Sequence, residues 1–441
     1  MKKLLSKVIQ CKETNGFLSG KMTKRISMVI GLLSIATIVF AQTVMYKIYI
    51  IGDSTVCNYA ASKYPWAGWG QELSYFFKTG TVTISNNAIG GRSSKSFYVE
   101  GRWATVVSQL KTGDFVLIQF GHNDRDYSDT TRYADTNTYK TYLRLYVKES
   151  RAKGAIPVFV SPMNMNTWTG TALREVFTET SRGANYRGAM MNVATELSVP
   201  FIDLEQKSAT FMKSAGQAYC TSFHFMGLQV GEYANYPDGY SDGTHFQEMG
   251  ALINARMVAE GIQELSTHAD VGKLAAVLAP LYKVTVTPNK TGTGLVTVSG
   301  EFPQGATVTV KVMPDSDETF EYWADASGKS LTVAKLYSFT MGAAAVTFNA
   351  MFKGGSAVAV MQNNVARVPC DFNIAYVNKR ISVHANQNIQ SIKIFDMNGK
   401  QVLSNHTVAQ NVIVNVDAVR SGVYCVVAAT SDGISKQMVK F

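Results

Sequence analysis

Five apolar runs alternate with amphipathic stretches along residues 42–275, and this alternation restricts the fold more than any other feature of the chain. Each run is almost continuously apolar, which is typical of strands buried on both faces of a parallel sheet. The order predicts a doubly wound α/β sheet. The expected strands are 48–51, 81–89, 114–120, 155–160 and 199–204, the expected helices are 69–78, 103–111, 138–153, 183–198 and 246–265, and a long loop is expected over 206–244.

Small and polar residues follow the first three predicted strands. Ser54 comes after the first strand, in Gly52-Asp53-Ser54-Thr55, Gly91 comes after the second, and Asn123 after the third. Ligands and catalytic groups collect at the carboxyl ends of the strands in open α/β sheets. Ser54 is therefore the candidate nucleophile, although each of these segments taken singly is also typical of a turn or a helix cap.

A serine nucleophile needs a histidine base, a carboxylate that orients it, and donors for the oxyanion. The segment Asp242-Gly243-Thr244-His245 supplies His245 as the base and Asp242 as the carboxylate, although the two residues are also typical of a cap for the helix that follows. A glycine lets a backbone N–H approach a ligand closely, so Gly91 is one candidate donor, and the Asn123 amide is another. Together these residues predict a serine hydrolase.

The net charge of +10 does not indicate a nucleic-acid partner, because it is unevenly distributed. Residues 1–41 hold seven Lys/Arg and one acid, residues 42–275 hold 21 of each sign, and residues 276–441 hold 14 basic and 10 acidic residues. The first segment has the layout of a secretory signal, with Lys24-Arg25, an apolar run over 26–40 and Ala41 before Gln42. We expect export with removal of residues 1–41, Met22 being an alternative start and an N-terminal membrane anchor the alternative interpretation.

The composition changes near Pro280 to β-rich runs separated by Gly, Pro and Asp turns. We divide the chain into a signal peptide (1–41), an α/β domain (42–275), a β-rich module (283–353) and a C-terminal β-sandwich (365–441). Both β-rich units have the size of small sandwiches. Cys57–Cys220 and Cys370–Cys425 bridges are both allowed in an exported protein, and the sequence does not decide between bridged and free cysteines.

The α/β domain resembles a known family. Gly52-Asp53-Ser54, Gly91, Gly121-His122-Asn123-Asp124 and Asp242-Gly243-Thr244-His245 match, in order, the four blocks of the SGNH (GDSL-like) hydrolases. The Gly-Asp-Ser-Thr variant and the segments 64–70 and 86–94 are similar to the rhamnogalacturonan acetylesterase group. The resemblance covers about residues 46–270 and implies a flavodoxin-like three-layer parallel sheet.

The same resemblance implies roles for the site residues. Ser54 would be the nucleophile, His245 the general base and then acid, and Asp242 the group that orients His245. The Ser54 N–H, the Gly91 N–H and the Asn123 side chain would form the oxyanion hole. No metal and no cofactor is implied.

The two C-terminal regions resemble extracellular modules. Residues 283–353, with Phe320-Glu321-Tyr322-Trp323, are similar to a divergent internalin-type B repeat. Residues 370–441, with Met397-Asn398-Gly399-Lys400 and Ser421-Gly422-Val423-Tyr424, are similar to the C-terminal sorting domain of type IX secretion, although Cys425 stands where an aliphatic residue is expected. This implies passage through the outer membrane by the type IX secretion machinery. A plain β-sandwich that binds glycan or acts as a spacer is the alternative.

We therefore predict a serine esterase, secreted or on the outer cell surface (the periplasm being the alternative), that removes O-acetyl groups from plant cell-wall polysaccharide, with pectin or rhamnogalacturonan as the expected substrate. Trp66 and Trp69 are candidates for stacking on sugar rings, and Arg92 or Lys95 for meeting a uronate. Core packing of the tryptophans and simple solvation of the cations are the alternatives. The alternative functions are an esterase acting on xylan, peptidoglycan or lipid, and a catalytically silent surface protein that binds glycan.

Overall fold

The computed structural model describes residues 45–180, 184–354, 372–377, 380–396, 401–417, 419, 422–430 and 434–440. The predicted signal segment and Cys370 lie outside these residues. The chain forms two compact units, which divide between residues 358 and 359. Within the described ranges, no helix has the length and apolar character needed to cross a membrane.

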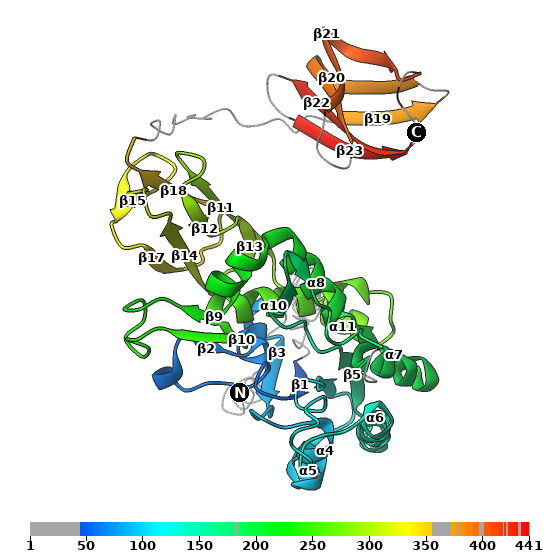
Figure 1. Ribbon diagram of the computed structural model, residues 1–441. Helices are drawn as coiled ribbons and strands as arrows, with labels where there is room; N and C mark the ends of the chain where they lie inside the picture. The colour runs from blue at the N-terminus through cyan, green and yellow to red at the C-terminus, as the bar shows by residue number, and fades with distance from the viewer. Residues whose placement is uncertain are drawn as a thin grey trace, which may run out of the picture. The chain divides into compact units, whose positions relative to one another are not determined.

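A five-stranded parallel sheet forms the centre of the first unit (Figure 1). Its strands are β1 (Tyr46–Ile51), β3 (Val82–Asn86), β4 (Phe115–Ile118), β5 (Ile156–Val160) and β8 (Phe201–Ile202). Their order in the sheet is β3-β1-β4-β5-β8. This is the flavodoxin-like order, in which the strand order reverses beside the first strand and leaves a crevice at the carboxyl ends. The predicted fold is confirmed.

Helices cover both faces of this sheet because the strand side chains alternate between two apolar clusters. Ile48 and Ile50 of β1 belong to one cluster, and Tyr49 and Ile51 belong to the other. The first face is covered by α3 (Trp69–Glu72), α8 (Leu204–Ala215), α10 (Glu248–Glu264) and α11 (Val271–Ala275). The second is covered by α4 (Ser94–Val99), α5 (Arg102–Gln109), α6 (Thr136–Ala152) and α7 (Tyr186–Leu197).

The expectation of a long loop over residues 206–244 was wrong. Most of α8 lies there, capped by the Asp203 carboxylate, which accepts the Gln206 N–H at 3.4 Å. The segment continues through α9 (Gln217–Tyr219), the π-helical turn η4 (Cys220–His224), β9 (Phe225–Leu228) and the start of β10 (Tyr240–Gln247). β10 pairs with β9 and with the two-residue strand β2 (Trp66–Ala67), which is distant in the sequence. A local pattern does not predict such a pairing.

Two smaller expectations were also wrong, and one helix was not predicted. The last helix begins at Glu248, because Phe246 and Gln247 pair with β2. The α-helix expected over residues 69–78 ends at residue 72 and continues as the 3₁₀ turn η2 (Leu73–Phe76). Helix α4 was not predicted, and it begins with a capping box between Ser93 and Ser96. The remaining short elements are η1 (Ala61–Lys63), β6 (Trp168–Thr169) and β7 (Ala172–Leu173).

Cys57 and Cys220 are both buried and unpaired, so the bridge that the sequence allows between them is not formed. The other allowed bridge involves Cys370 and lies outside the described residues.

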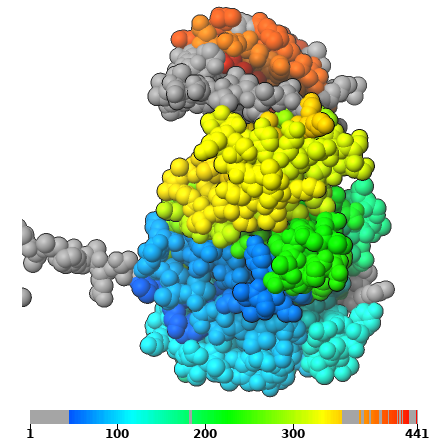
Figure 2. Space-filling view, turned by 90° about the vertical axis from the view of Figure 1, so that its left-hand side faces the viewer, coloured from blue at the N-terminus to red at the C-terminus, as the bar shows by residue number. Residues whose placement is uncertain are grey.

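The rest of the first unit is a β-rich module of two sheets, which we call the middle module (residues 281–352). One sheet has the order β13-β11-β18-β15-β16 and the other β12-β14-β17. Their strands are β11 (Leu281–Pro288), β12 (Gly294–Val296), β13 (Gly300–Pro303), β14 (Thr307–Pro314), β15 (Phe320–Ala324), β16 (Ser330–Thr332), β17 (Leu336–Thr340) and β18 (Val346–Phe352). Buried side chains of this module, such as Val310 and Trp323, belong to the same apolar cluster as Ile48 and Ile50 of the parallel sheet. In Figure 2 the atoms of this module (yellow) lie directly against the blue and green atoms of residues 46–265.

The second unit is an antiparallel sheet with its own apolar core. Its strands are β19 (Phe372–Val377), β20 (Arg380–Phe395), β21 (Gln401–Asn415), β22 (Val423–Thr430) and β23 (Ile434–Lys440). The order is β19-β20-β22-β23, with β21 paired to β20. Ile381, Ile392 and Val426 are among the completely buried residues of its core.

Candidate active site

Ser54 lies at the carboxyl end of β1, where the chain must turn within a very small space. A Cβ atom on Gly52 would lie 2.8 Å from both the Gln119 carbonyl oxygen and Val56 Cγ2, so only glycine fits there. The turn is closed by the Val56 and Cys57 N–H groups, which donate to the Asp53 carbonyl. The Ser54 side chain is therefore displayed at the edge of the sheet.

Ser54, His245 and Asp242 form a continuous chain of hydrogen bonds. His245 Nε2 lies 2.8 Å from Ser54 Oγ, and His245 Nδ1 lies 2.8 Å from Asp242 Oδ2. Asp242 Oδ1 accepts the N–H groups of Thr244 at 2.6 Å and His245 at 3.1 Å. Burial by itself raises the pKa of Asp242, but His245 and these N–H donors outweigh it and lower the pKa below its usual value. Asp242 is thus a carboxylate that can orient the imidazole and stabilise its protonated form.

The segment with Asp242 and His245 is a bulge between β9 and β10. Asp242 pairs with Met226 and Phe246 pairs with Phe225, so residues 243–245 have no partner on β9. The Asn166 N–H donates to the Gly243 carbonyl at 2.8 Å and supports the bulge from the loop after β5. The spacing of three residues thus places both side chains on one bulge.

The loops after β3 and β4 lie beside Ser54 and carry the candidate oxyanion donors. A Cβ atom on Gly90 would lie 3.6 Å from Ser54 Cβ, and Gly91 has a left-handed φ of 76° that favours glycine. Among the backbone hydrogen bonds of the described residues, none uses the N–H of Ser54 or Gly91. The loops are joined by Asp124, whose carboxylate accepts the Ser94 N–H at 3.0 Å. Burial raises the pKa of Asp124 to about 7, although the bonds from Ser94 oppose the shift.

The orientation of the Asn123 amide is set by two neighbours. Its Oδ1 accepts from Arg132 Nη1 at 3.2 Å, and its Nδ2 donates to the Arg92 carbonyl at 3.1 Å. Arg132 is itself held by ion pairs with Asp126 and Asp129. The sequence pattern does not point to Arg132, because its effect depends on the loop that brings it back to Asn123.

A buried polar network adjoins the nucleophile, and the sequence pattern does not predict it either. Asp53 is completely buried, accepts from the Thr55 N–H and hydroxyl, and pairs with His122 Nδ1 at 3.2 Å. Gln119 continues the network by donating to Thr55 Oγ1 at 3.0 Å. Tyr59 donates its hydroxyl to the Ser54 carbonyl at 2.7 Å. These contacts fix the backbone on both sides of Ser54.

The four predicted sugar contacts are placed very differently. Trp66 is half-buried, and its ring centroid lies 4.7 Å from that of His245. Trp69 is completely buried and donates its indole N–H to Gln119 at 2.8 Å, so it is a core residue and the expectation of sugar stacking was wrong. Arg92 pairs with Glu100, and Lys95 donates to the Thr130 carbonyl at 3.0 Å.

Among the described residues, no three or more His, Cys, Asp or Glu side chains are grouped so that they could hold a metal ion.

Three families of known proteins match consecutive parts of the chain. The GDSL-like lipase/acylhydrolase family matches residues 50–251, the divergent InlB B-repeat domain matches residues 282–356, and the secretion system C-terminal sorting domain matches residues 377–440. The resemblances to an SGNH hydrolase and to a sorting domain are thereby confirmed.

Two relatives come from Bacillus subtilis (strain 168). The rhamnogalacturonan acetylesterase RhgT is 39% identical over 223 residues, which cover 50% of this chain and 90% of RhgT. YesY, named a probable rhamnogalacturonan acetylesterase, is 35% identical over 219 residues, which cover 49% of this chain and 93% of YesY. YxiM from the same species has a crystal structure that matches this chain with 25% sequence identity and a TM-score of 0.41. The match covers 51% of this chain and 58% of the YxiM chain.

The matched region contains the carboxyl end of β1 with Ser54, the loops after β3 and β4, and the β10 bulge with Asp242 and His245. Because the chain covers nine tenths of a relative that is 39% identical, it belongs to the GDSL-like lipase/acylhydrolase family and is a carboxylic ester hydrolase.

Proposed function

We propose that the protein is an exported acetylesterase that removes O-acetyl groups from a pectic polysaccharide of the rhamnogalacturonan type. The observation that carries the proposal is the hydrogen-bonded chain Ser54–His245–Asp242 at the carboxyl edge of the sheet. The relatives named rhamnogalacturonan acetylesterases support the substrate class.

The first half of the proposed reaction acetylates Ser54. His245 Nε2 takes the Ser54 proton while Oγ attacks the acetyl carbonyl carbon, and the carbonyl oxygen becomes an oxyanion. The N–H groups of Ser54 and Gly91 and the Asn123 amide stabilise this oxyanion. When the tetrahedral intermediate collapses, His245 returns the proton to the sugar oxygen, and the polysaccharide leaves with a free hydroxyl group.

The second half hydrolyses the acetyl-enzyme. A water molecule gives a proton to His245 Nε2 and attacks the acetyl carbon, so a second oxyanion forms in the same place. Its collapse returns the proton to Ser54 and releases acetate. Asp242 stays ionised throughout, since its pKa is lowered, and it stabilises the imidazolium in both halves.

Trp66, Arg92 and Lys95 are the proposed contacts with the polymer, and Trp69 is not among them because it is completely buried. Trp66 packs on His245, and Tyr240, which is 38% exposed, lies 5.7 Å from Trp66 between ring centroids. Aromatic rings of this kind suit the apolar faces of sugars. Arg92 and Lys95 adjoin Gly91 in the sequence and would place positive charge near a uronate.

Acetate release from acetylated rhamnogalacturonan, homogalacturonan and xylan tests the proposal. The assay uses residues 42–441, with Ser54→Ala as the control. We expect release from the pectic polymers that disappears in the control. Release from xylan alone would refute the pectic substrate while keeping the mechanism. Inactivity on all three polymers and on a small aryl acetate would refute the esterase and favour a glycan-binding protein.

We also propose that the predicted boundaries divide the chain by role: a signal over 1–41, the esterase over 42–275, the β-rich module over 283–353, and a signal for type IX secretion over 365–441. The match of residues 377–440 to a sorting domain supports export. Deleting residues 365–441 in a host with this secretion system should move the enzyme from the medium or cell surface to the periplasm. An unchanged distribution on immunoblots of the cell fractions would contradict this assignment.

A further inference from the structure

Strand β14 of the middle module contributes Lys311, a buried cation whose partners all belong to the α/β domain (residues 42–275). The Lys311 side chain is 7% exposed, and its Nζ donates to the Ser222 carbonyl at 2.8 Å. The same ammonium group forms an ion pair with Glu232 and lies 5.1 Å from the centre of the Phe223 ring. A buried charge with these partners is costly to disturb, because removing one partner leaves the other charge uncompensated.

Both oxygen partners of Lys311 flank β9, the strand opposite the bulge that carries Asp242 and His245. Ser222 belongs to η4, which ends immediately before β9. Glu232 lies in the loop that joins β9 to β10, where its carboxylate also accepts the Gln229 N–H at 2.8 Å. One side chain of the middle module therefore holds both ends of β9.

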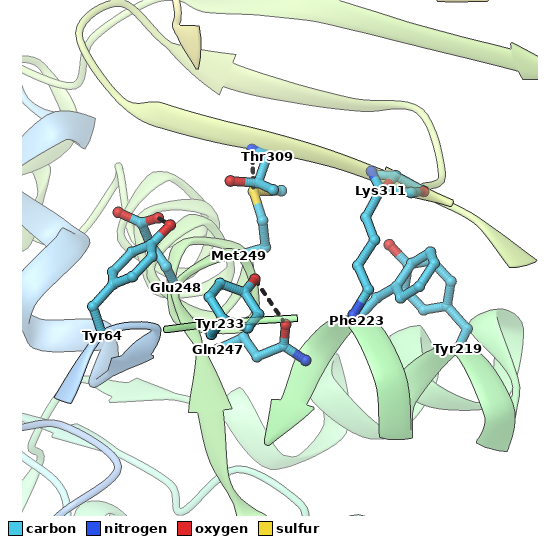
Figure 3. A pocket seen from close by; sticks show the side chains of 10 residues that line it. Tyr64, Tyr219, Phe223, Tyr233, Gln247, Glu248, Met249, Thr309 and Lys311 are labelled. Atoms are coloured by element: carbon cyan, nitrogen blue, oxygen red, sulfur yellow. Dashed lines mark hydrogen bonds between the residues drawn. The ribbon is translucent and has the colours of Figure 1, made fainter. Parts of the chain in front are cut away.

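Gln247 connects the same contacts to the histidine. It lies two residues after His245 and is 3% exposed. Its Nε2 donates to the Ser222 carbonyl at 2.8 Å and to the Phe225 carbonyl at 2.6 Å. The Tyr233 hydroxyl donates to its Oε1 at 3.4 Å (Figure 3). Lys311 and Gln247 thus share the Ser222 carbonyl as an acceptor.

The next two residues, Glu248 and Met249, also accept hydrogen bonds, one from the loop before β2 and one from the middle module. The Tyr64 hydroxyl donates to the Glu248 carboxylate at 3.0 Å, and the Thr309 N–H of β14 donates to Met249 Sδ at 3.1 Å (Figure 3). Through these contacts and the continuous apolar cluster, the middle module packs against the segment that follows His245.

We propose that Lys311 is a positioning residue for His245 and Asp242, and that the middle module is a part of the catalytic unit. The inference rests on the proposed roles of Ser54, His245 and Asp242, but not on the polysaccharide substrate. Without the ammonium group, the Ser222 carbonyl and the Glu232 carboxylate lose their shared donor, so the two ends of β9 are no longer held by one side chain. A shift of about 1 Å at a catalytic group costs up to about 100-fold in rate.

The test compares full-length Lys311→Met, Lys311→Arg and Lys283→Met with the wild type on a small aryl acetate. Lys283 is an exposed lysine of β11 and serves as the matched control. We expect Lys311→Met to lower kcat about tenfold or more with KM within about twofold. Lys311→Arg should recover part of the loss, because the guanidinium keeps the charge and the donors. Lys283→Met should match the wild type.

A purely structural role is distinguished by the double variant Lys311→Met/Glu232→Leu. Apolar residues in place of a buried ion pair often restore stability. We expect the double variant to regain the wild-type melting temperature while kcat stays low, because the Ser222 carbonyl still lacks the Lys311 donor and keeps only Gln247. It also serves as the test protein if Lys311→Met does not fold.

Wild-type kcat in either folded variant would overturn the inference and leave the module as a spacer. Ser54→Ala separates this failure from failure of the proposed function. An inactive Ser54→Ala beside a fully active Lys311→Met refutes only the positioning role. A fully active Ser54→Ala refutes the catalytic assignment on which the inference rests.

Discussion

Replacing Asn123 by alanine tests the oxyanion hole through a single side chain. The Asn123 amide oxygen is occupied by Arg132 and one amide N–H is occupied by the Arg92 carbonyl, so its second N–H is available for the substrate oxygen. Because the amide is already fixed, it stabilises the oxyanion without reorganisation. Loss of one such donor lowers kcat by about 10²–10³, or roughly 3–4 kcal/mol. We expect Asn123→Ala to show this loss with KM almost unchanged.

Arg132 offers an independent check, since it acts on the oxyanion only through Asn123. Arg132→Met frees the Asn123 amide without removing it, and we expect a smaller loss of kcat, about tenfold. In the Asn123→Ala background the same substitution should have almost no effect, because groups that act as a unit are not additive. Asp129→Asn is the control, as it changes an exposed ion pair of Arg132 and should leave kcat within about twofold.

The assay is the initial rate with 4-nitrophenyl acetate, together with the amplitude of the first turnover. Two results would refute the reasoning. One is an Asn123→Ala variant with kcat within threefold of the wild type. The other is full additivity of the two substitutions, which would mean that Arg132 acts independently of the amide.

Three further variants test the site and its support. Asp242→Asn should lower kcat by roughly 10²–10⁴ on the aryl acetate, because the neutral amide no longer stabilises the imidazolium; a loss of less than tenfold would contradict this role. Gly91→Ala should destabilise the fold by about 1 kcal/mol in urea titrations, because its φ of 76° disfavours a side chain, and should lower kcat/KM as the N–H moves; an unchanged kcat/KM would argue against the Gly91 N–H as a donor. The pKa of Asp124 is raised from 3.8 to about 7 by burial, so the folded state holds the proton more tightly than the unfolded state, and the associated stability is present below about pH 4 and is lost as the pH rises through 7. Asp124→Asn should therefore reduce the fall in unfolding free energy between pH 5 and pH 8 by about 2–3 kcal/mol, and an unchanged fall would contradict the shift.

The central sheet and the neighbourhood of Ser54 were predictable because both depend on local patterns. Apolar runs that stop at Gly52, Gly90 and Gly121 mark strand ends, and parallel strands place those ends at one edge of a sheet. The sequence therefore brings the loops after β1, β3 and β4 together before any long-range contact is known. The structure places Ser54, Gly90 and Asn123 in these loops.

The segment before His245 was not predictable in the same way. Residues 225–228 and 240–247 become strands because they pair with each other, and because Phe246 and Gln247 pair with Trp66–Ala67, more than 150 residues away. Their Gly, Ser and Tyr content indicates a loop when it is considered without these partners. The bulge that holds Asp242 and His245 is a property of that pairing, although the spacing of the two residues was informative.

The remaining differences come from side chains whose surroundings only the folded chain defines. Trp69 carries the same aromatic signal as Trp66, yet one is buried against Gln119 and the other lies on His245. Lys311 lies in an alternating β run and has the sequence pattern of an exposed cation. Its burial depends on Ser222 and Glu232, which come from another part of the first unit.

The most direct test of the account is rapid-quench mass spectrometry of the enzyme mixed with acetylated rhamnogalacturonan oligosaccharide. We predict that the peptide containing Ser54 transiently gains the mass of one acetyl group, and that Ser54→Ala and His245→Ala do not gain it. Acetate release without any acetylated peptide, or acetylation at a residue other than Ser54, would contradict the proposed mechanism.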